Sequence, residues 1–239
     1  MELQQSNFAQ FADSWWDKNG AMRMLHSMHE TRMLFIKERI KNRFNNFKDF
    51  KSIMKNKTIL DLGCGGGLLS EDLSRYDANI IAVDSSKELI KMANERAIKN
   101  KIKIDYRNTT IQKLAEKKNK FDIVISLEVI EHVKDYRPFL NNIFKCIKPN
   151  GILILSTINR TFFSYLSTIL IAEKILKLVP DSIHDWNLYL KPNEIIEHCE
   201  KSKMQLDKLS GLFPIPSMRG IQWIRTKNYS SNYILSIIN

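Results

Sequence analysis

The 239-residue sequence contains few cysteines, glycines and prolines. Its three cysteines, Cys64, Cys146 and Cys199, are odd in number and widely separated, which excludes a disulfide framework and a CxxC zinc site and favours a reducing compartment. Eight glycines and six prolines are too few for a collagen-like or low-complexity chain. With 44% hydrophobic and 26% charged residues, the chain is expected to fold as a globular protein.

Long hydrophobic runs are also missing. The most apolar stretch, residues 161–172, is shorter than the roughly 20 residues that a membrane-spanning helix needs. The first residues, MELQQSNFAQFADSWWD, include acidic side chains and no apolar core segment, so they resemble neither a secretory signal nor an Arg-rich transit peptide. These features predict a cytoplasmic protein with no transmembrane helix.

Acidic residues are in deficit, because 37 Lys and Arg face 26 Asp and Glu, for a net charge of +11. Such a surplus favours anionic partners, including phosphate ligands, acidic lipid surfaces and nucleic acid. The basic residues are spread along the chain without a long run, which is typical of a generally Lys-rich sequence. We therefore expect no nucleic-acid partner, although the charge keeps an RNA or DNA methylase as an alternative.

Residues 58–157 alternate short apolar runs with spacers of helix length. The five runs are TILDLG, NIIAVD, IKIDYR, FDIVISL and GILILST. This alternation predicts an α/β fold, a Rossmann-like parallel sheet with helices on both faces. Two further segments, residues 206–216 and 232–238, are expected to supply the last two strands.

The pattern around this sheet predicts one domain spanning residues 1–239. Residues 1–50 show helical spacing of apolar positions and are expected to form an N-terminal helical lid. Ser85 is expected to cap a helix with Leu89, Ile90, Ala93 and Ala97 on its buried face, and Asp135 to cap the helix after the fourth strand. An insertion over residues 159–191 follows the fifth strand, and its apolar positions between 162 and 179 fall on one helical stripe.

Glycines cluster at the end of the first strand, in Asp61-Leu62-Gly63-Cys64-Gly65-Gly66-Gly67. Leu68 stands where the dinucleotide pattern GxGxxG needs its third glycine, so that pattern fails. The sequence fits DxGxGxG instead, and the second strand ends in Asp84, whose carboxylate can accept hydrogen bonds from ribose hydroxyls. This order of acid, glycine loop and second-strand acid is that of Rossmann-like S-adenosylmethionine methyltransferases.

Two carboxylates and an imidazole follow the fourth strand, in Leu127-Glu128-Val129-Ile130-Glu131-His132-Val133. At the carboxyl end of a central strand they would face the ligand cleft of an open α/β sheet. There they could hold a divalent cation or act as a general base. The structural alternatives are that Glu128 caps a backbone amide, that Glu131 is solvated and that His132 is a packing residue.

With these motifs, the sequence resembles the ubiquinone-biosynthesis O-methyltransferases, which methylate a hydroxyl of a polyprenylated phenol or catechol. The resemblance covers nearly the whole chain. It includes SWWD at 14–17 with His26 and Arg32 downstream, the two core motifs above, STINR at 156–160, AEKILKLVP at 172–180, HDW at 184–186 and KPNE at 191–194.

The resemblance implies a set of roles for residues of this chain. The cofactor, S-adenosylmethionine, would lie against the backbone of Gly63 and near Asp84, with Leu127 near its adenosine and Arg32 at its methionine carboxylate. Asp61, Gly65 and Gly67 complete the expected cofactor loop. Glu128, Glu131 and His132 would be catalytic and would bind a divalent metal, Mg²⁺ or Zn²⁺, beside the substrate hydroxyls.

A polyprenylated substrate resides in a bilayer, so the stripe at 162–179, with Lys174 and Lys177, is expected to dock on an anionic membrane surface. Ordinary core packing of this stripe is the alternative. The expected location is the cytoplasmic inner face of the membrane, where other enzymes of the ubiquinone pathway are possible partners. Competing functions are a C-methylase of the same fold and a non-catalytic membrane scaffold.

Overall fold

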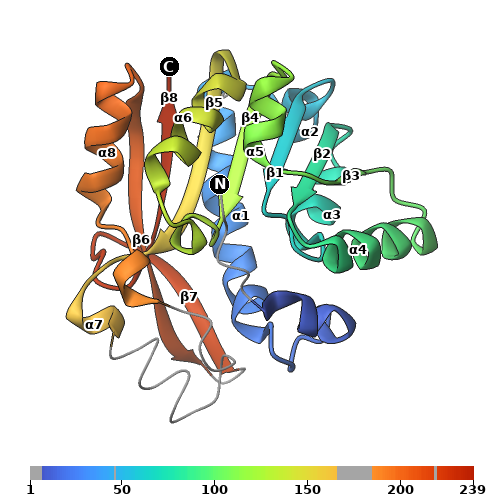
Figure 1. Cartoon of the computed structure of the whole chain (residues 1–239), viewed down its shortest axis with the longest axis horizontal. Helices are drawn as coiled ribbons and strands as arrows, with labels where there is room; N and C mark the ends of the chain where they lie inside the picture. Colours follow the sequence, from blue (N-terminus) through green and yellow to red (C-terminus); the bar gives the residue numbers. More distant parts are fainter. Residues whose placement is uncertain (1–6, 46, 166–184, 218–219) are drawn as a thin grey trace.

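One eight-stranded sheet forms the centre of the computed structural model, which describes residues 7–45, 47–165, 185–217 and 220–239 (Figure 1). The strand order is β3-β2-β1-β4-β5-β8-β6-β7. Strands β1 to β5 are mutually parallel, whereas β8 is antiparallel to both β5 and β6. The strands are β1 (Thr58–Leu62), β2 (Asn79–Asp84), β3 (Asp105–Asn108), β4 (Phe121–Leu127), β5 (Ile147–Ile158), β6 (Gln205–Ser217), β7 (Gly220–Thr226) and β8 (Asn232–Ile238).

The five strands predicted from the apolar runs are confirmed, with one change of extent. β3 begins at Asp105 rather than at Ile102. The amide of Ile102 donates to the carbonyl of Ala97, 2.8 Å away, and so closes the preceding helix instead of joining the sheet. The prediction of two C-terminal strands was incomplete, because residues 220–226 form an additional strand, β7, that pairs with β6.

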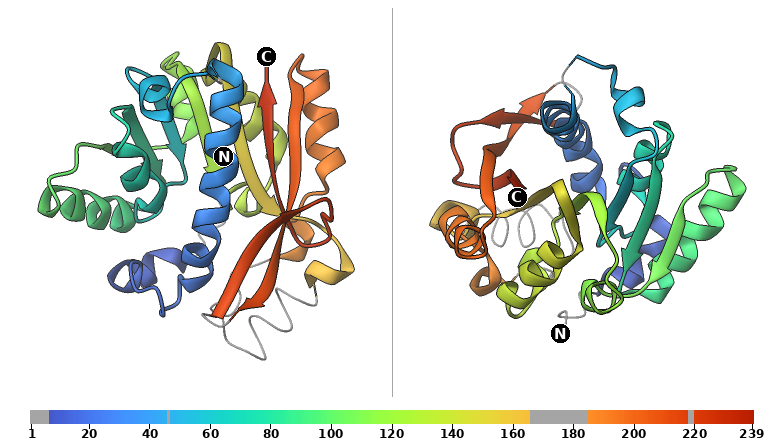
Figure 2. Two further views of the ribbon diagram at one scale, coloured as in Figure 1. Left: turned by 180° about the vertical axis from the view of Figure 1, so that it is seen from behind. Right: turned by 90° about the horizontal axis from the view of Figure 1, so that it is seen from above.

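Helices cover both faces of the sheet (Figure 2). Along the central strands, neighbouring side chains alternate between two buried clusters, as the pleat requires. One cluster holds Leu153 and Leu155 of β5 and packs under α5, α6 and α8; the other holds Ile152 and Ile154 and packs under α1 and α2. The helices are η1 (Asn7–Ser14), α1 (Arg23–Phe44), α2 (Phe50–Met54), α3 (Leu68–Ser74), α4 (Lys87–Lys99), α5 (Ile111–Glu116), η2 (Ile130–His132), α6 (Tyr136–Cys146), α7 (Phe162–Ser164), η4 (Trp186–Leu188) and α8 (Pro192–Lys201).

Helix α4 begins one residue later than predicted. Its N-cap is Ser86, whose hydroxyl accepts from the amide of Leu89 at 3.2 Å, so the assignment of this cap to Ser85 was wrong. The reason is that Asp84 accepts from the Ser86 amide and holds residues 84–86 in a turn. The predicted apolar stripe of α4 is buried, and the predicted Asp135 cap of α6 is confirmed.

The N-terminal segment is helical, as predicted, with η1, α1 and α2 in its described part. The predicted stripe at 162–179 lies mostly outside the described residues. Its first turn is α7, where Phe162 is 74% exposed and the hydroxyl of Thr161 caps the helix. Within the part of the chain that the structure describes, no helix has the length and apolarity needed to cross a bilayer.

Candidate active site

The loop of residues 63–67 leaves β1 in a conformation that requires glycine. Gly63, Gly65 and Gly67 have φ angles of +75°, +52° and +87°, which side chains with a Cβ rarely adopt. A Cβ on Gly65 or on Gly66 would also lie 2.3 Å from the indole of Trp15. The loop therefore needs glycine both for its backbone angles and for the close approach of another part of the chain.

Asp84 lies beside this loop, as predicted. β1 and β2 pair in parallel with Leu62 opposite Val83, which brings the end of β2 next to the loop. One carboxylate oxygen of Asp84 accepts from the amide of Gly65 at 3.0 Å, and the other accepts from the amide of Ser86 at 2.9 Å. Burial raises the pKa of Asp84, and the backbone amides partly oppose that rise because they stabilise the ionised form.

Asp61 supports the loop from within the core. It is 3% exposed, and its carboxyl accepts a hydrogen bond from the hydroxyl of Ser70 on α3. The pKa of Asp61 is raised from 3.8 to about 7, mainly by burial; the hydrogen bond from Ser70 opposes the rise and the nearby charge of Asp84 adds to it. This carboxyl is therefore poised to change its charge near neutral pH.

The predicted acidic cluster lies at the end of β4. Leu127 is the last strand residue, Glu128 follows with a φ of +53°, and η2 carries Glu131 and His132. The amide of Glu128 donates to the carbonyl of Ser156, which ties this turn to β5. Glu131 and His132 are 1% and 7% exposed, so Glu131 is not the solvated surface acid of the alternative interpretation.

Glu128 and Arg32 form a buried ion pair. The Nη2 atom of Arg32 lies 3.1 Å from Oε1 of Glu128, and the two side chains are 5% and 11% exposed. Ser156 donates to the same oxygen at 2.7 Å, and Asn232 donates to Oε2 at 3.1 Å. The residue expected at the cofactor carboxylate and the first residue of the acidic cluster therefore contact each other directly.

Glu131 is held on one side only. Thr157 donates to its Oε2 at 2.8 Å, whereas its buried Oε1 has no hydrogen-bond partner among the described residues. Burial, reinforced by the charge of Glu128, raises the pKa of Glu131 well above its usual range. A buried carboxyl with an unmatched oxygen is costly for stability, and such groups are common at functional sites.

Sequence reasoning missed the partners that hold these acids, namely Ser156, Thr157 and Asn232. All three are polar residues within apolar strand runs, the first two at the end of ILILST and the third at the start of NYILSII. A polar side chain in an otherwise buried strand needs a hydrogen-bond partner. That requirement is the signal that could have marked them as part of a buried polar site.

The three predicted metal ligands, Glu128, Glu131 and His132, follow one another at the end of β4. Within the described ranges, no group of three or more His, Cys, Asp or Glu side chains is arranged to hold a metal ion. Glu128 is engaged through both oxygens. The unmatched oxygen of Glu131, together with the oxygen and nitrogen donors of this cluster, suits Mg²⁺ or Zn²⁺ chemically. Metal binding by these residues stays a prediction.

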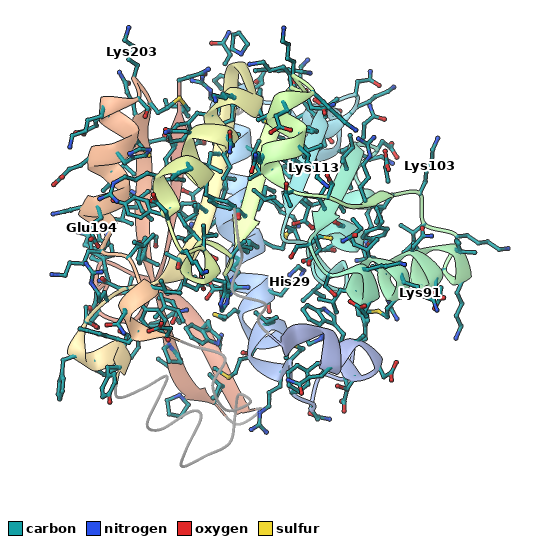
Figure 3. All side chains as sticks on the ribbon, viewed as in Figure 1. His29, Lys91, Lys103, Lys113, Glu194 and Lys203 are labelled. Atoms are coloured by element: carbon teal, nitrogen blue, oxygen red, sulfur yellow. The ribbon has the colours of Figure 1, made fainter. Side chains whose placement is uncertain are left out.

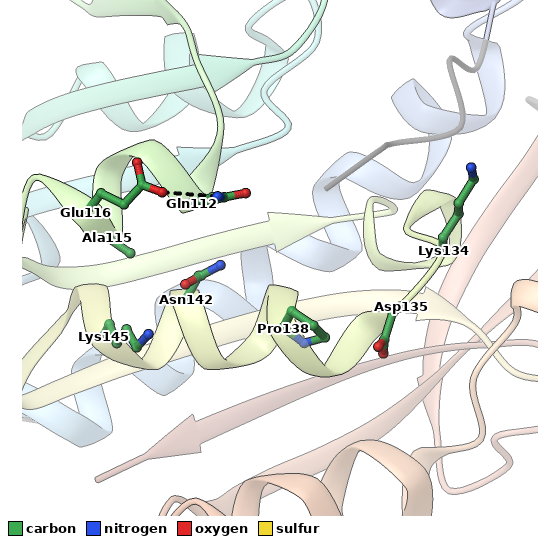
Figure 4. A pocket seen from close by; sticks show the side chains of 8 residues that line it. All are labelled: Gln112, Ala115, Glu116, Lys134, Asp135, Pro138, Asn142 and Lys145. Carbon is green, nitrogen blue, oxygen red and sulfur yellow. Dashed lines mark hydrogen bonds between the residues drawn. The ribbon is translucent and has the colours of Figure 1, made fainter.

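A separate surface pocket lies between α5 and α6 (Figure 4), and none of the predicted site residues lines it. It is lined by Gln112, Ala115, Glu116, Lys134, Asp135, Pro138, Asn142 and Lys145. Exposed lysines are distributed over several elements: Figure 3 shows Lys103, before β3, and Lys203, after α8, pointing away from the fold. The candidate site is therefore the acidic cluster at the end of β4, with the glycine loop beside it, and not this pocket.

Comparisons with known proteins agree with this geometry. The family described as "Methyltransferase domain" matches residues 60–155. A ubiquinone biosynthesis O-methyltransferase of Pelagibacter ubique (strain HTCC1062) is 40% identical, over 97% of this chain and 95% of that protein. One of Bartonella tribocorum is 38% identical, over 96% and 92%.

The fold is shared with solved methyltransferase structures of low sequence identity. Magnesium protoporphyrin IX methyltransferase of Synechocystis PCC 6803, solved with bound SAM, superposes with a TM-score of 0.64 at 14% identity, over 99% of this chain and 93% of that one. This likeness concerns the fold alone. The two full-length relatives carry the assignment, and on that basis the chain belongs to the ubiquinone biosynthesis O-methyltransferase family.

Proposed function

We propose that this methyltransferase transfers the methyl group of S-adenosylmethionine to a hydroxyl oxygen of a polyprenylated phenol or catechol in ubiquinone biosynthesis. One observation carries the proposal: the glycine loop and the acidic cluster lie at the same edge of the sheet. The glycine loop with Asp84 lies at the carboxyl ends of β1 and β2, and the buried acidic cluster lies at the carboxyl end of β4, which pairs with β1. Open α/β sheets bind their ligands at this edge.

The residues around the loop suit an adenosyl cofactor. Asp84 has a carboxylate that could accept from ribose hydroxyls, and Gly63, Gly65 and Gly67 leave room for a ligand near the backbone. Leu127 would contact the adenosine, and Asp61 would support the loop. For Arg32 to reach the methionine carboxylate, it would have to exchange its present partner, Glu128, for the cofactor.

The chemistry requires a proton acceptor. A neutral phenol, with a pKa near about 10, is a weak nucleophile until it loses its proton. Glu131 and His132 are the candidates, because both are buried at the strand end where the substrate oxygen would lie. Glu128 would align the site through its contacts with Asn232 and Ser156.

We also propose that Glu128, Glu131 and His132 hold a divalent cation when substrate is bound. Such a cation, Mg²⁺ or Zn²⁺, supplies positive charge that stabilises a phenolate. The unmatched oxygen of Glu131 supports this proposal. The ion pair of Glu128 with Arg32 opposes it unless Arg32 turns to the cofactor.

We also propose that residues 1–239 form one domain, in which residues 1–50 act as a lid. The remaining part of the proposal is attachment to the membrane at its cytoplasmic face. The described start of the insertion presents exposed aromatic side chains: Phe162, Phe163 and Tyr165 are 74%, 43% and 37% exposed. Aromatic side chains of this kind favour the lipid interface. Other enzymes of the pathway would meet the protein there.

A product assay tests the reaction. The protein is incubated with labelled S-adenosylmethionine and a short-chain polyprenyl catechol, and the product is analysed by mass spectrometry. Label on an oxygen supports the proposal, whereas label on a ring carbon would assign a C-methylase. The control substrate has both catechol hydroxyls already methylated and should accept no label. Transfer to RNA or DNA in place of the catechol would contradict the proposal.

Flotation with anionic liposomes tests the membrane surface. Replacing Phe162 and Phe163 by serine should lower the bound fraction, as should the double change Ile169→Glu with Leu176→Glu in the predicted stripe. Ile98→Ser is the matched control, because this isoleucine on α4 is 69% exposed and outside the insertion. If the double change unfolds the protein while liposome binding persists in the folded fraction, the stripe is core and not a membrane surface.

A further inference from the structure

The N-terminal segment is attached directly to the glycine loop. The indole nitrogen of Trp16 donates to the carbonyl of Gly66 at 3.1 Å, across 50 residues of sequence. The indole of the preceding residue, Trp15, packs against Gly65 and Gly66. The chain before α1 therefore covers the loop, and Figure 1 shows η1 beside α4 at this end of the sheet.

A second set of contacts holds Trp16 in place. The guanidinium carbon of Arg96, on α4, lies 3.5 Å from the centre of the Trp16 ring. The Nε atom of Arg96 donates to Glu71 on α3 at 2.8 Å, and the Glu71 side chain is 10% exposed. Glu71, Arg96 and Trp16 thus form a continuous chain of contacts that joins α3, α4 and the N-terminal segment. We call these three residues the latch.

The latch and Asp84 hold consecutive residues of the loop. Asp84 accepts from the amide of Gly65, and Trp16 donates to the carbonyl of Gly66. Glycine has the widest conformational freedom of any residue, so a loop built of glycines needs such external contacts to keep one shape. Without Trp16, the peptide between Gly66 and Gly67 would lose the donor that orients it.

We propose that the latch positions the glycine loop and sets how long the cofactor stays bound. This inference rests on the proposed cofactor site, and it assigns Trp16, Arg96 and Glu71 as positioning residues that act through the loop. The planar guanidinium is required, because it stacks on the indole while its edge donates to Glu71. An ammonium group cannot do both in the same way.

The test measures binding and release of S-adenosylhomocysteine by the full chain. Calorimetry gives the dissociation constant, and chase of labelled ligand gives the dissociation rate. Arg96→Met should raise the dissociation rate at least about fivefold, roughly what losing one stacked cation–π pair costs. Arg96→Lys should restore little of this loss. Trp16→Phe keeps a ring for stacking but loses the donor to Gly66, so it should have a smaller effect in the same direction.

Arg107→Met is the matched control, because it removes an exposed Arg–Asp pair from β3 and should leave release unchanged. At saturating S-adenosylmethionine, the turnover of the latch variants should stay within about twofold of wild type, so that KM rises and kcat does not. Thermal melting identifies any variant that is simply unfolded, and Trp16→Phe and Arg96→Lys serve as the mild replacements.

Two results overturn the inference: release from folded Arg96→Met and Trp16→Phe at the rate of the Arg107→Met control, or a loss of kcat with unchanged affinity. Failure of the wild-type protein to bind S-adenosylhomocysteine would reject the cofactor assignment itself, and the latch with it.

Discussion

The glycine loop and the acidic cluster lie at the same edge of the sheet but are built in different ways. In the loop, the chemistry is carried by backbone groups, and the acid that binds them, Asp84, is only 19 residues from Gly65. In the cluster, Glu128 contacts Arg32, Ser156 and Asn232, and the last of these is 104 residues away. The loop and its acid come from adjacent strands, whereas the partners of the cluster come from the whole fold.

This difference predicts how strongly each of the two sites responds to substitutions. A loop whose bonds are made by the backbone responds to changes of glycine, of Asp84 and of the latch that holds it. A buried set of charged side chains responds strongly when a charged partner is removed, because an unpaired buried charge costs several kcal/mol. Five predictions test that contrast.

Turnover should depend most strongly on the cluster. His132→Ala or Glu131→Gln should lower kcat by about a hundredfold to ten-thousandfold, the usual contribution of a positioned base, while the affinity for S-adenosylhomocysteine changes less than about twofold. Steady-state kinetics and calorimetry provide the two measurements. Strong cofactor loss with retained turnover would mean that the cluster belongs to the cofactor site.

Chelation distinguishes metal binding by the acids of this cluster from a metal-free role of His132 as general base. If the acids hold a divalent ion, EDTA abolishes turnover and added Mg²⁺ or Zn²⁺ restores it. If His132 is a metal-free base, EDTA has no effect and only the His132 variant is severely impaired. Full activity in protein shown to be metal-free by elemental analysis would end the metal proposal.

Asp61 should make stability depend on pH. Its pKa is about 7 in the folded protein against an ordinary 3.8, so between these values the folded state binds more protons than the unfolded state. The stabilisation is fully present below about pH 4 and is lost as the pH rises toward 7, at about 1.4 kcal/mol per unit. Urea unfolding from pH 5 to 8 should show a smaller decline in the free energy of unfolding for Asp61→Asn than for the wild type. The control, Asp105→Asn, should decline as the wild type does. An equal decline in Asp61→Asn and the wild type would contradict this prediction.

Asp84→Ala should weaken cofactor binding by about 1.5 to 3 kcal/mol, the usual range for hydrogen bonds to a charged group. Calorimetry with S-adenosylhomocysteine measures it, and NAD should not bind to either protein, because the loop lacks the third glycine of GxGxxG. Asp207→Ala, which removes an ion pair with Arg39 on α1, is the control. Unchanged affinity in Asp84→Ala would remove this residue from the cofactor site.

Thr157→Val should have the smallest effect. It removes the hydroxyl that donates to Glu131 but keeps the shape of a fully buried side chain. A single hydrogen bond contributes about 0.5 to 1.5 kcal/mol, so kcat should fall by no more than about tenfold, and Thr157→Ser should recover most of it. A loss as large as that of Glu131→Gln would show that the threonine does more than hold the acid.

Much of the fold could be predicted because its signals are local. Apolar runs, glycine spacing and capping residues identified β1, β2, β4 and β5, the loop and Asp84, since each depends on residues near one another in the chain. The prediction was less accurate where competition between neighbours decides the outcome: Ile102 closes α4 and does not begin β3, and Ser86 caps α4 in place of Ser85. It also missed β7, which pairs with β6.

The sequence by itself determined the order of the five parallel strands, the glycine loop with its acid, and the presence of two carboxylates and a histidine after β4. Only the tertiary structure decided what those carboxylates contact. The pairing of Arg32 with Glu128, the bond from Thr157 to Glu131 and the latch of Trp16 on Gly66 join segments that are remote in sequence. The physical reason is that burial and hydrogen-bond partnership, which control charge and pKa, are properties of the packed chain and not of any short segment of it.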